Sequence, residues 1–215
     1  MREVAEEVED PRAMTSSNDR PPRAWQRMLS GRRLDLLSPD PKDIEIEDIA
    51  HGLARVARWN GQTTGAHAFS VAQHCLIVTD IVAALHPDFT ANELLAALLH
   101  DAPEYVVGDL ISPFKTAIGL DYKAFELNLL QAIYCRFGVR ALSVAALAAI
   151  KKADTIAAYY EATRLAGFET PEAENFFGIP NLPTELHSAL MVLEPVPASN
   201  AQSLFLAKFG ELLPR

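Results

Sequence analysis

The sequence has 215 residues, of which 49% are hydrophobic and 22% charged, and its formal net charge at pH 7 is -9. This length and composition predict one domain with a substantial hydrophobic core. The acidic charge argues against nucleic acid and anionic membranes as partners, because both attract a surplus of Lys and Arg on one face of a protein.

Targeting signals and disulfides are not expected. The first residues are acidic where a signal peptide carries a basic and then an apolar segment, and no stretch approaches the roughly 18 apolar residues of a membrane span. Cys75 and Cys135 both lie in runs typical of apolar helices, so a disulfide framework has little support. We therefore expect a cytoplasmic protein.

The chain begins with a segment that does not read as folded. Residues 1–23 are acidic and then rich in Ser, Asn and Pro, without apolar periodicity, and predict a disordered tail before a domain over 24–215 with core motifs at 47–167. Short apolar runs at 34–37 and 44–46, separated by Ser-Pro-Asp-Pro, predict at most a short β-hairpin.

The first predicted helix covers the segment EDIAHGLARVARW at 47–59, where apolar residues recur at helical spacing. Asn60 and Gly61 form the stop signal after it. Ser70 and Gln73 then form an S-x-x-Q capping box, which predicts the start of a helix that runs to about residue 85.

The next helix opens with a second capping box, formed by Thr90 and Glu93, and is predicted to end at His100-Asp101 because Pro103 disfavours helical geometry at the residue before it. A Pro- and Gly-rich loop is expected at 168–183. Further helices are predicted over 121–137, 143–166, 185–193 and 201–213. The fold class is therefore all-α, a single-domain multi-helix bundle.

Four polar residues on the predicted core helices indicate a metal site. His74 lies near the start of one helix, His100 and Asp101 end the next, and Asp154 lies in a helix among apolar neighbours. A carboxylate in such surroundings is costly to bury unless it is paired or binds a metal. Taken singly, each of these side chains could instead be solvated or hydrogen-bonded, but their joint placement on three helices favours ligands around one ion.

The donor set of two imidazoles and two carboxylates suits one divalent transition metal ion, namely Co, Mn, Zn, Fe or Ni, with Mg as a further alternative. Such an ion lowers the pKa of bound water and polarises a phosphoryl oxygen, which together predict metal-assisted hydrolysis.

The segments AFSVAQHC, ALLHDAPEYVVGDLISPFK and KKADTIAA resemble the HD-domain phosphohydrolases, most closely their branch of bacterial 5'-deoxynucleotidases. The resemblance covers about residues 30–167. The opening part of this range, GRRLDLLSPDPKDIEIEDIAHGLARVARWNGQT, is also similar to a related group that includes viral deoxyadenosine triphosphohydrolases. The resemblance implies an HD-type bundle, metal ligation by His74, His100, Asp101 and Asp154, and dimers or larger homo-oligomers.

The resemblance also implies roles for residues around the metal. Glu104 matches the catalytic acid of the family, which acts on the attacking water or the leaving oxygen, and Asp109 is implied both in catalysis and in contacting the deoxyribose. The other substrate-binding residues that the resemblance implies are Arg58, Trp59, Ser112 and Lys115. Gln62 departs from the His often found in the relatives, which leaves the role of that position open.

The sequence therefore predicts an enzyme that hydrolyses deoxyribonucleoside 5'-monophosphates to deoxynucleoside and phosphate. One alternative is a deoxynucleoside triphosphohydrolase that releases triphosphate, and another is a non-catalytic nucleotide-binding module. A dinuclear centre is disfavoured because no His occurs between Asp101 and Asp154. Guanosine tetraphosphate hydrolases are a nearer rival, but they carry a Glu-Asp pair where this chain has Pro103-Glu104-Tyr105.

Overall fold

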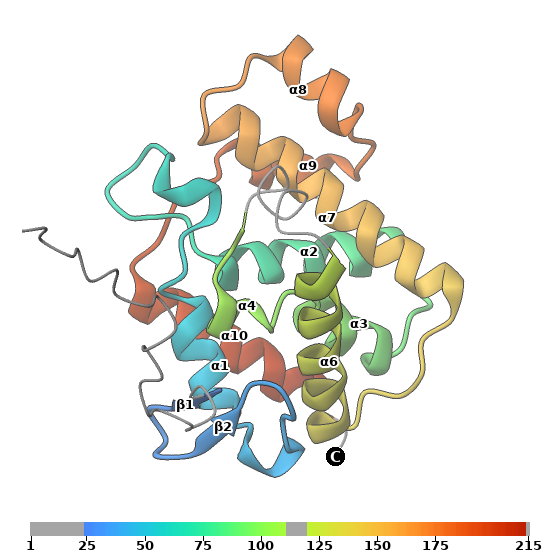
Figure 1. Cartoon of the computed structure of the whole chain (residues 1–215). Coiled ribbons are helices and arrows are strands. Elements are labelled where there is room, and N and C mark those ends of the chain that lie inside the picture. Colours follow the sequence, from blue (N-terminus) through green and yellow to red (C-terminus); the bar gives the residue numbers. More distant parts are fainter. Residues whose placement is uncertain (1–23, 111–119, 214–215) are drawn as a thin grey trace, which may run out of the picture.

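The computed structural model describes residues 24–110 and 120–213. Within these ranges the chain is mostly helical and its sheet is a two-stranded hairpin, so the predicted all-α class is confirmed (Figure 1). The predicted tail at 1–23 and the predicted site residues Ser112 and Lys115 lie outside the described residues. None of the described helices has both the length and the apolar character that crossing a membrane requires.

The hairpin pairs β1 (Trp25–Arg27) with β2 (Arg33–Asp35) in antiparallel register. Leu34 is fully buried and anchors the hairpin in the core. The strand expected over 34–37 stops early because the Asp35 carboxylate accepts the backbone amides two and three residues further on, at 3.0 and 2.9 Å, and so turns the chain.

The strand expected over 44–46 is wrong. Ile44 is buried, but it follows a 3-10 helix, η1 (Pro41–Asp43), and α1 (Ile46–Leu53) begins directly after it. The Asp40 side chain caps η1 by accepting a backbone amide at 2.9 Å. The alternation of isoleucines resembled a strand, but this cap and the proline after it favour a helical turn.

The helix expected over 47–59 is also shorter than predicted, since α1 ends at Leu53. It packs closely on the short helix α4 (Glu104–Val107): a Cβ added at Gly52 would lie 2.8 Å from the Cβ of Tyr105. Glycine is therefore required where the two helices cross.

The turn after α1, η2 (Arg58–Gly61), has an unusual backbone. Trp59 and Asn60 have φ values of 56° and 50°, and among the described residues they are the non-glycine residues with positive φ. The Arg58 amide donates to the carbonyl of Phe69 at 2.8 Å, so the chain here runs beside the segment that precedes the next helix. The predicted stop signal lies within this turn rather than at the helix end.

The long helix α2 (Val71–Leu85) begins at the predicted cap, but only one of the two hydrogen bonds of the expected capping box forms. Ser70 Oγ accepts the backbone amide of Gln73 at 3.3 Å as predicted. The prediction that the Gln73 side chain bonds back to the backbone amide of Ser70 is wrong. The Gln73 side chain instead donates to the carbonyl of Glu194 at 3.1 Å and accepts the amide of Val196 at 3.0 Å. Gln73 therefore fastens α2 to a segment far along the chain.

The next helix, α3 (Ala91–Leu98), has the complete capping box predicted for Thr90 and Glu93. It ends before His100 and Asp101, which lie in the turn that leads to α4.

The remaining helices correct one expectation. The loop expected over 168–183 contains a helix, α8 (Thr170–Phe177), which begins with Pro171 in its first turn, where no amide is needed, and ends at Gly178 with φ 78°. The other helices of this half are α6 (Leu120–Phe137), α7 (Val144–Arg164), α9 (Thr184–Met191) and α10 (Ala198–Leu212).

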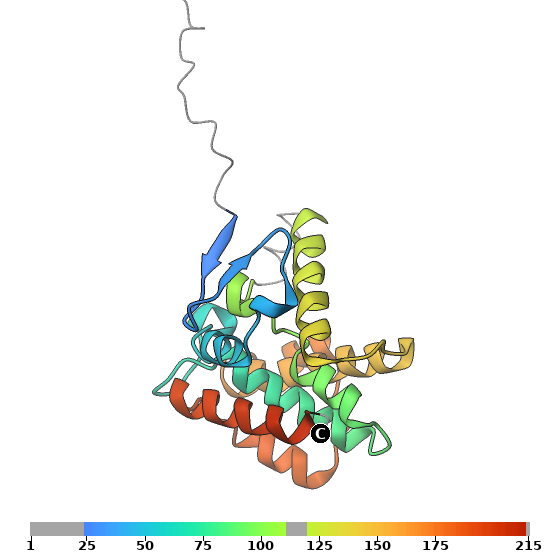
Figure 2. The same ribbon diagram turned by 90° about the horizontal axis from the view of Figure 1, so that it is seen from below.

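The bundle is arranged around α2, which packs against α3, α7 and α10 (Figure 1). One core cluster joins α1, α3 and α10 through residues such as Leu53, Leu98 and Phe205, and a second joins α2 to α7 through residues such as Val82 and Ile156. In the view of Figure 2, the hairpin and α6 lie on one side of the molecule and α10 on the other. Because α2 contributes to both clusters, its side chains are held in place from two sides.

Candidate metal centre

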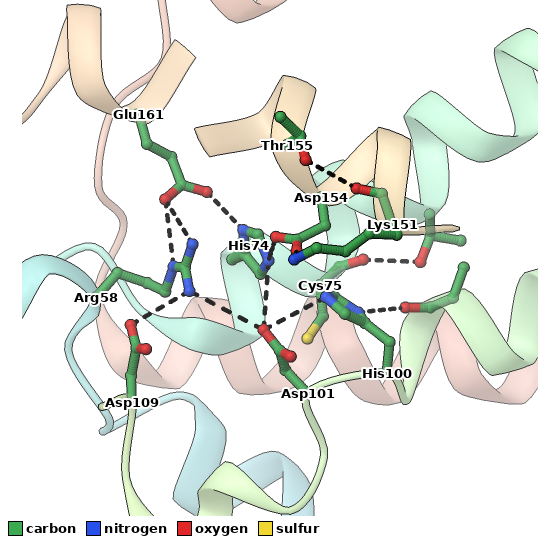
Figure 3. Close-up of polar contacts among 12 residues, drawn as sticks. Arg58, His74, Cys75, His100, Asp101, Asp109, Lys151, Asp154, Thr155 and Glu161 are labelled. Atoms are coloured by element: carbon green, nitrogen blue, oxygen red, sulfur yellow. Dashed lines mark hydrogen bonds and ion pairs between the residues drawn. The ribbon is translucent and has the colours of Figure 1, made fainter. Parts of the chain in front are cut away.

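Three segments bring the four predicted metal ligands together (Figure 3). His74 lies on α2, His100 and Asp101 follow α3, and Asp154 lies on α7. His74 Nε2 is 3.4 Å from Asp101 Oδ2 and 3.2 Å from Asp154 Oδ1, and His100 Nε2 is 3.3 Å from Asp101 Oδ2. One potential donor atom from each of His74, His100 and Asp101 lies within 4.8 Å of the others, a group that could hold a metal ion.

Each imidazole is fixed by an acceptor at its Nδ1 atom. His100 Nδ1 lies 2.8 Å from the carbonyl of Ala97, and His74 Nδ1 lies 2.5 Å from Glu161 Oε1. Both partners can only accept, so each Nδ1 carries a proton, and Nε2 is the nitrogen that faces the carboxylates and that would bind a metal once it has no proton. Burial lowers the pKa of both rings, but the neighbouring carboxylates outweigh this and raise it well above its usual range. Both Nε2 atoms are buried and have no hydrogen-bond partner among the residues that the structure describes. A divalent cation fits this donor set.

The carboxylates of the site are ionised. Burial raises the pKa of Asp101, but His100 and His74 outweigh burial and hold it well below its usual range. Burial likewise raises the pKa of Asp154, and its contact with His74 outweighs this and lowers it. Lys151 Nζ lies 2.7 Å from the second oxygen of Asp154. The site therefore presents anionic oxygens beside two imidazole nitrogens.

Glu161, on α7, was missed by the sequence reasoning. It is fully buried, and besides His74 it bonds Trp59 Nε1 at 2.8 Å and Arg58 Nε at 3.2 Å. Burial raises its pKa, but Arg58 and His74 outweigh this and hold the pKa at about 2. Its position seven residues after Asp154, on the same face of one helix, was a signal that could have found it.

The predicted substrate residues Arg58 and Trp59 lie at the edge of this cluster. The Arg58 guanidinium contacts Asp109 Oδ2 at 3.3 Å, Glu161 Oε2 at 3.2 Å and, more distantly, Asp101 Oδ2 at 4.0 Å. Burial lowers the pKa of Arg58, but these carboxylates outweigh it and raise the pKa, so the group stays charged. Asp109, predicted to contact the sugar, is thus an ion-pair partner of Arg58.

Arg58, Trp59 and Asp109 line one cavity of about 670 Å³. Asp101 and Asp154 lie on its walls together with Arg58 and Glu104, and the Glu104 side chain is buried at the start of α4. A larger hollow of about 950 Å³ is lined by other residues, including Thr90, Arg136 and Phe209, and contains none of the predicted site residues.

Aromatic side chains close another part of this cavity. The Trp59 ring lies edge-on to Phe168, with centroids 5.6 Å apart, and to Phe177 at 6.3 Å. Phe176 and Phe177 come from α8, so the helix that the sequence analysis missed supplies part of the wall. We call Trp59, Phe168, Phe176 and Phe177 the aromatic wall.

Comparison with known proteins identifies a relative of this chain. No protein-family model matches it. It is 53% identical over 192 residues to an uncharacterized protein of Rhodobacter capsulatus, an alignment that covers 89% of this chain and 96% of that one. The chain therefore belongs to the same family as this Rhodobacter capsulatus protein.

Proposed function

We propose that the protein is a metal-dependent phosphohydrolase of the HD-domain type that converts deoxyribonucleoside 5'-monophosphates to deoxynucleoside and phosphate. The observation that carries the proposal is the composition of one cavity. Carboxylates of the candidate metal site, the guanidinium of Arg58, whose side chain is 13% exposed, and a buried Glu line the same space as a wall of aromatic rings. A phosphate ester of a flat, ring-bearing molecule matches this division into a charged and an aromatic half.

The residues of the charged half have distinct tasks in this proposal. A divalent ion bound to His74, His100, Asp101 and Asp154 would supply an activated water and polarise a phosphoryl oxygen. Arg58 is positioned by its carboxylate partners to bind the phosphate, since a guanidinium presents several donors to anionic oxygens. Glu104 would transfer a proton to or from the reacting oxygens, and it lines the same cavity as Asp101 and Asp154.

The charge of the cavity favours a monophosphate over a triphosphate. The described residues that line it include four carboxylates, Asp101, Glu104, Asp109 and Asp154. The described cations on its walls are Arg58, which is ion-paired, and Lys151, which contacts Asp154. A triphosphate would bring more negative charge into this space, and like charges repel strongly where water is scarce.

A screen of nucleotides tests the proposal. The full chain is assayed with ribo- and deoxyribonucleoside mono- and triphosphates in the presence of Mn, Co, Zn or Mg, and phosphate and triphosphate are measured as separate products. We expect phosphate release from deoxyribonucleoside monophosphates, which is lost with a chelator and in Asp154→Asn. Triphosphate release above monophosphate turnover would favour the triphosphohydrolase alternative, and nucleotide binding without turnover under any metal would favour the non-catalytic one.

A further inference from the structure

Glu161 contacts both the predicted metal ligand His74 and the predicted phosphate-binding residue Arg58, each through a different carboxylate oxygen (Figure 3). Oε1 faces Nδ1 of His74, whereas Oε2 accepts from the indole of Trp59 and from the guanidinium of Arg58. The side chain has no exposed surface. A buried carboxylate is stable only where its lone pairs are matched by donors, and here the donors come from three side chains.

The contact with His74 decides which ring nitrogen can bind a metal. Because the carboxylate accepts the proton of Nδ1, the neutral ring that binds a metal would present its lone pair on Nε2, the atom 3.2 Å from Asp154 and 3.4 Å from Asp101. A partner that donated to Nδ1 would leave the proton on Nε2 and remove this ligand. Carboxylates that hold ligating histidines in this way strengthen metal binding, and their loss typically weakens it about 10- to 100-fold.

The second oxygen supports a strained turn. Arg58 and Trp59 belong to η2, where Trp59 has φ 56° and ψ 29°, a conformation that a bulky residue adopts only where surrounding contacts impose it. The bonds from Trp59 Nε1 and Arg58 to Glu161 are such contacts. They aim the guanidinium into the cavity, where its Nη1 also reaches Asp109.

We propose that Glu161 is a positioning residue that couples the metal ligand His74 to the phosphate-binding pair Arg58 and Trp59. This inference rests on two parts of the proposed function, namely the metal site that includes His74 and the binding of phosphate by Arg58. It adds that the single buried carboxylate of Glu161 sets both the tautomer of His74 and the geometry of Arg58 and Trp59. Loss of both of its oxygens would therefore affect metal binding and phosphate binding together.

Glu161→Gln tests the coupling because the amide keeps the shape but has a single acceptor oxygen. If that oxygen faces Arg58 and Trp59, the NH₂ group faces His74 and favours the wrong tautomer. If it faces His74, the NH₂ group opposes two donors. In the first orientation we expect Co²⁺ affinity, followed by the visible absorption of the ion, to fall about 10- to 100-fold. In the second, affinity of the cobalt-loaded protein for inorganic phosphate should fall about tenfold.

Glu185→Gln, which makes the same change at an exposed position on α9, is the matched control and should leave both affinities unchanged. Because either orientation of the amide satisfies one set of partners, Glu161→Gln should lower at least one affinity, whereas Glu161→Leu, which removes both acceptor oxygens, should lower both. Wild-type values of both affinities in Glu161→Gln, or a fall in only one of them in Glu161→Leu, would overturn the coupling. So would a wild-type protein that binds no Co²⁺.

A measurement on the wild type covers the case in which Glu161→Gln does not fold. In ¹⁵N-histidine NMR spectra of the zinc-loaded protein, His74 should carry its proton on Nδ1 and bind zinc through Nε2. Zinc on Nδ1, or no proton there, contradicts the inference. None of these readouts requires turnover. A protein that shows the expected effects but hydrolyses no nucleotide would refute the proposed function and leave the role of Glu161 intact.

Discussion

His100 and Asp101 lie in the turn between α3 and α4, and this position explains how two adjacent residues can face the same site. Successive residues of a helix point about 100° apart, so in a continuing helix these side chains would diverge. The helix stops two residues before His100, and the turn brings Nε2 of His100 within 3.3 Å of Asp101 Oδ2. Pro103 prevents the helix from continuing smoothly through this point.

Glu104 is the residue whose role is most open to a direct test. Glu104→Gln keeps the volume of this buried side chain and removes its ability to exchange a proton. We expect unchanged metal content and a loss of about 10²- to 10⁴-fold in kcat, the usual contribution of general acid-base catalysis. Metal analysis and steady-state kinetics on deoxyribonucleoside monophosphates check this, with Glu185→Gln as the control. Wild-type kcat in Glu104→Gln would show that the assigned role is wrong.

At the scale of elements, α8 and η2 place the aromatic wall. Phe177 of α8 lies 6.3 Å from Trp59 of η2, although more than a hundred residues separate them in the chain. Edge-on packing of this kind leaves ring faces available to a flat ligand. The wall is therefore suited to the base or sugar end of a nucleotide when the phosphate lies near Arg58.

Phe177→Ala removes part of this wall. Stacking on an aromatic side chain is worth about 1–3 kcal/mol per base, so we expect KM to rise by about five- to a hundredfold with a smaller effect on kcat. Steady-state kinetics on one deoxyribonucleoside monophosphate measure both constants. Ile179→Ala, an exposed apolar truncation two residues away, serves as the control. An unchanged KM in Phe177→Ala would exclude the wall from substrate binding.

The elements that could be predicted from sequence are those whose ends depend on local chemistry. The starts of α2, α3 and α7 follow from Ser70, Thr90 and Ser143, each of which bonds an amide in the first turn of its own helix. The early end of α1 and the turn at η2 depend on contacts with residues far along the chain, such as Tyr105 and Glu161. No local pattern carries that information.

The candidate site likewise contains residues that could be chosen from the sequence and contacts that could not. His100, Asp101 and Glu104 lie within one short motif, and His74 and Asp154 lie on helices that the sequence predicts, so all five could be chosen from sequence. Their approach to one another agrees with the expected cluster, and their roles remain predictions. The contact between Arg58 and Glu161 joins residues 103 positions apart and could not be inferred before the fold was known.

At the scale of the whole molecule, negative charge is concentrated where α2, α7 and the turn after α3 meet. The carboxylates of Asp101, Asp154 and Glu161 have lowered pKa values although burial raises them, and all three are therefore ionised in surroundings that exclude most water. Like charges in such surroundings repel each other, and Arg58, Lys151 and the imidazoles of His74 and His100, whose pKa the carboxylates raise, offset this charge. A divalent cation bound between the imidazoles and the carboxylates would take the place of the imidazole protons in this balance.

The central claim, that four residues from three segments hold one divalent ion, is tested most directly by anomalous diffraction from crystals of the cobalt-loaded protein. We expect one strong peak per chain, at about 2.0–2.2 Å from His74 Nε2, His100 Nε2 and oxygens of Asp101 and Asp154. His100→Ala should lose the peak without losing the fold. A wild-type peak at other residues, or no peak at saturating cobalt, would contradict the account.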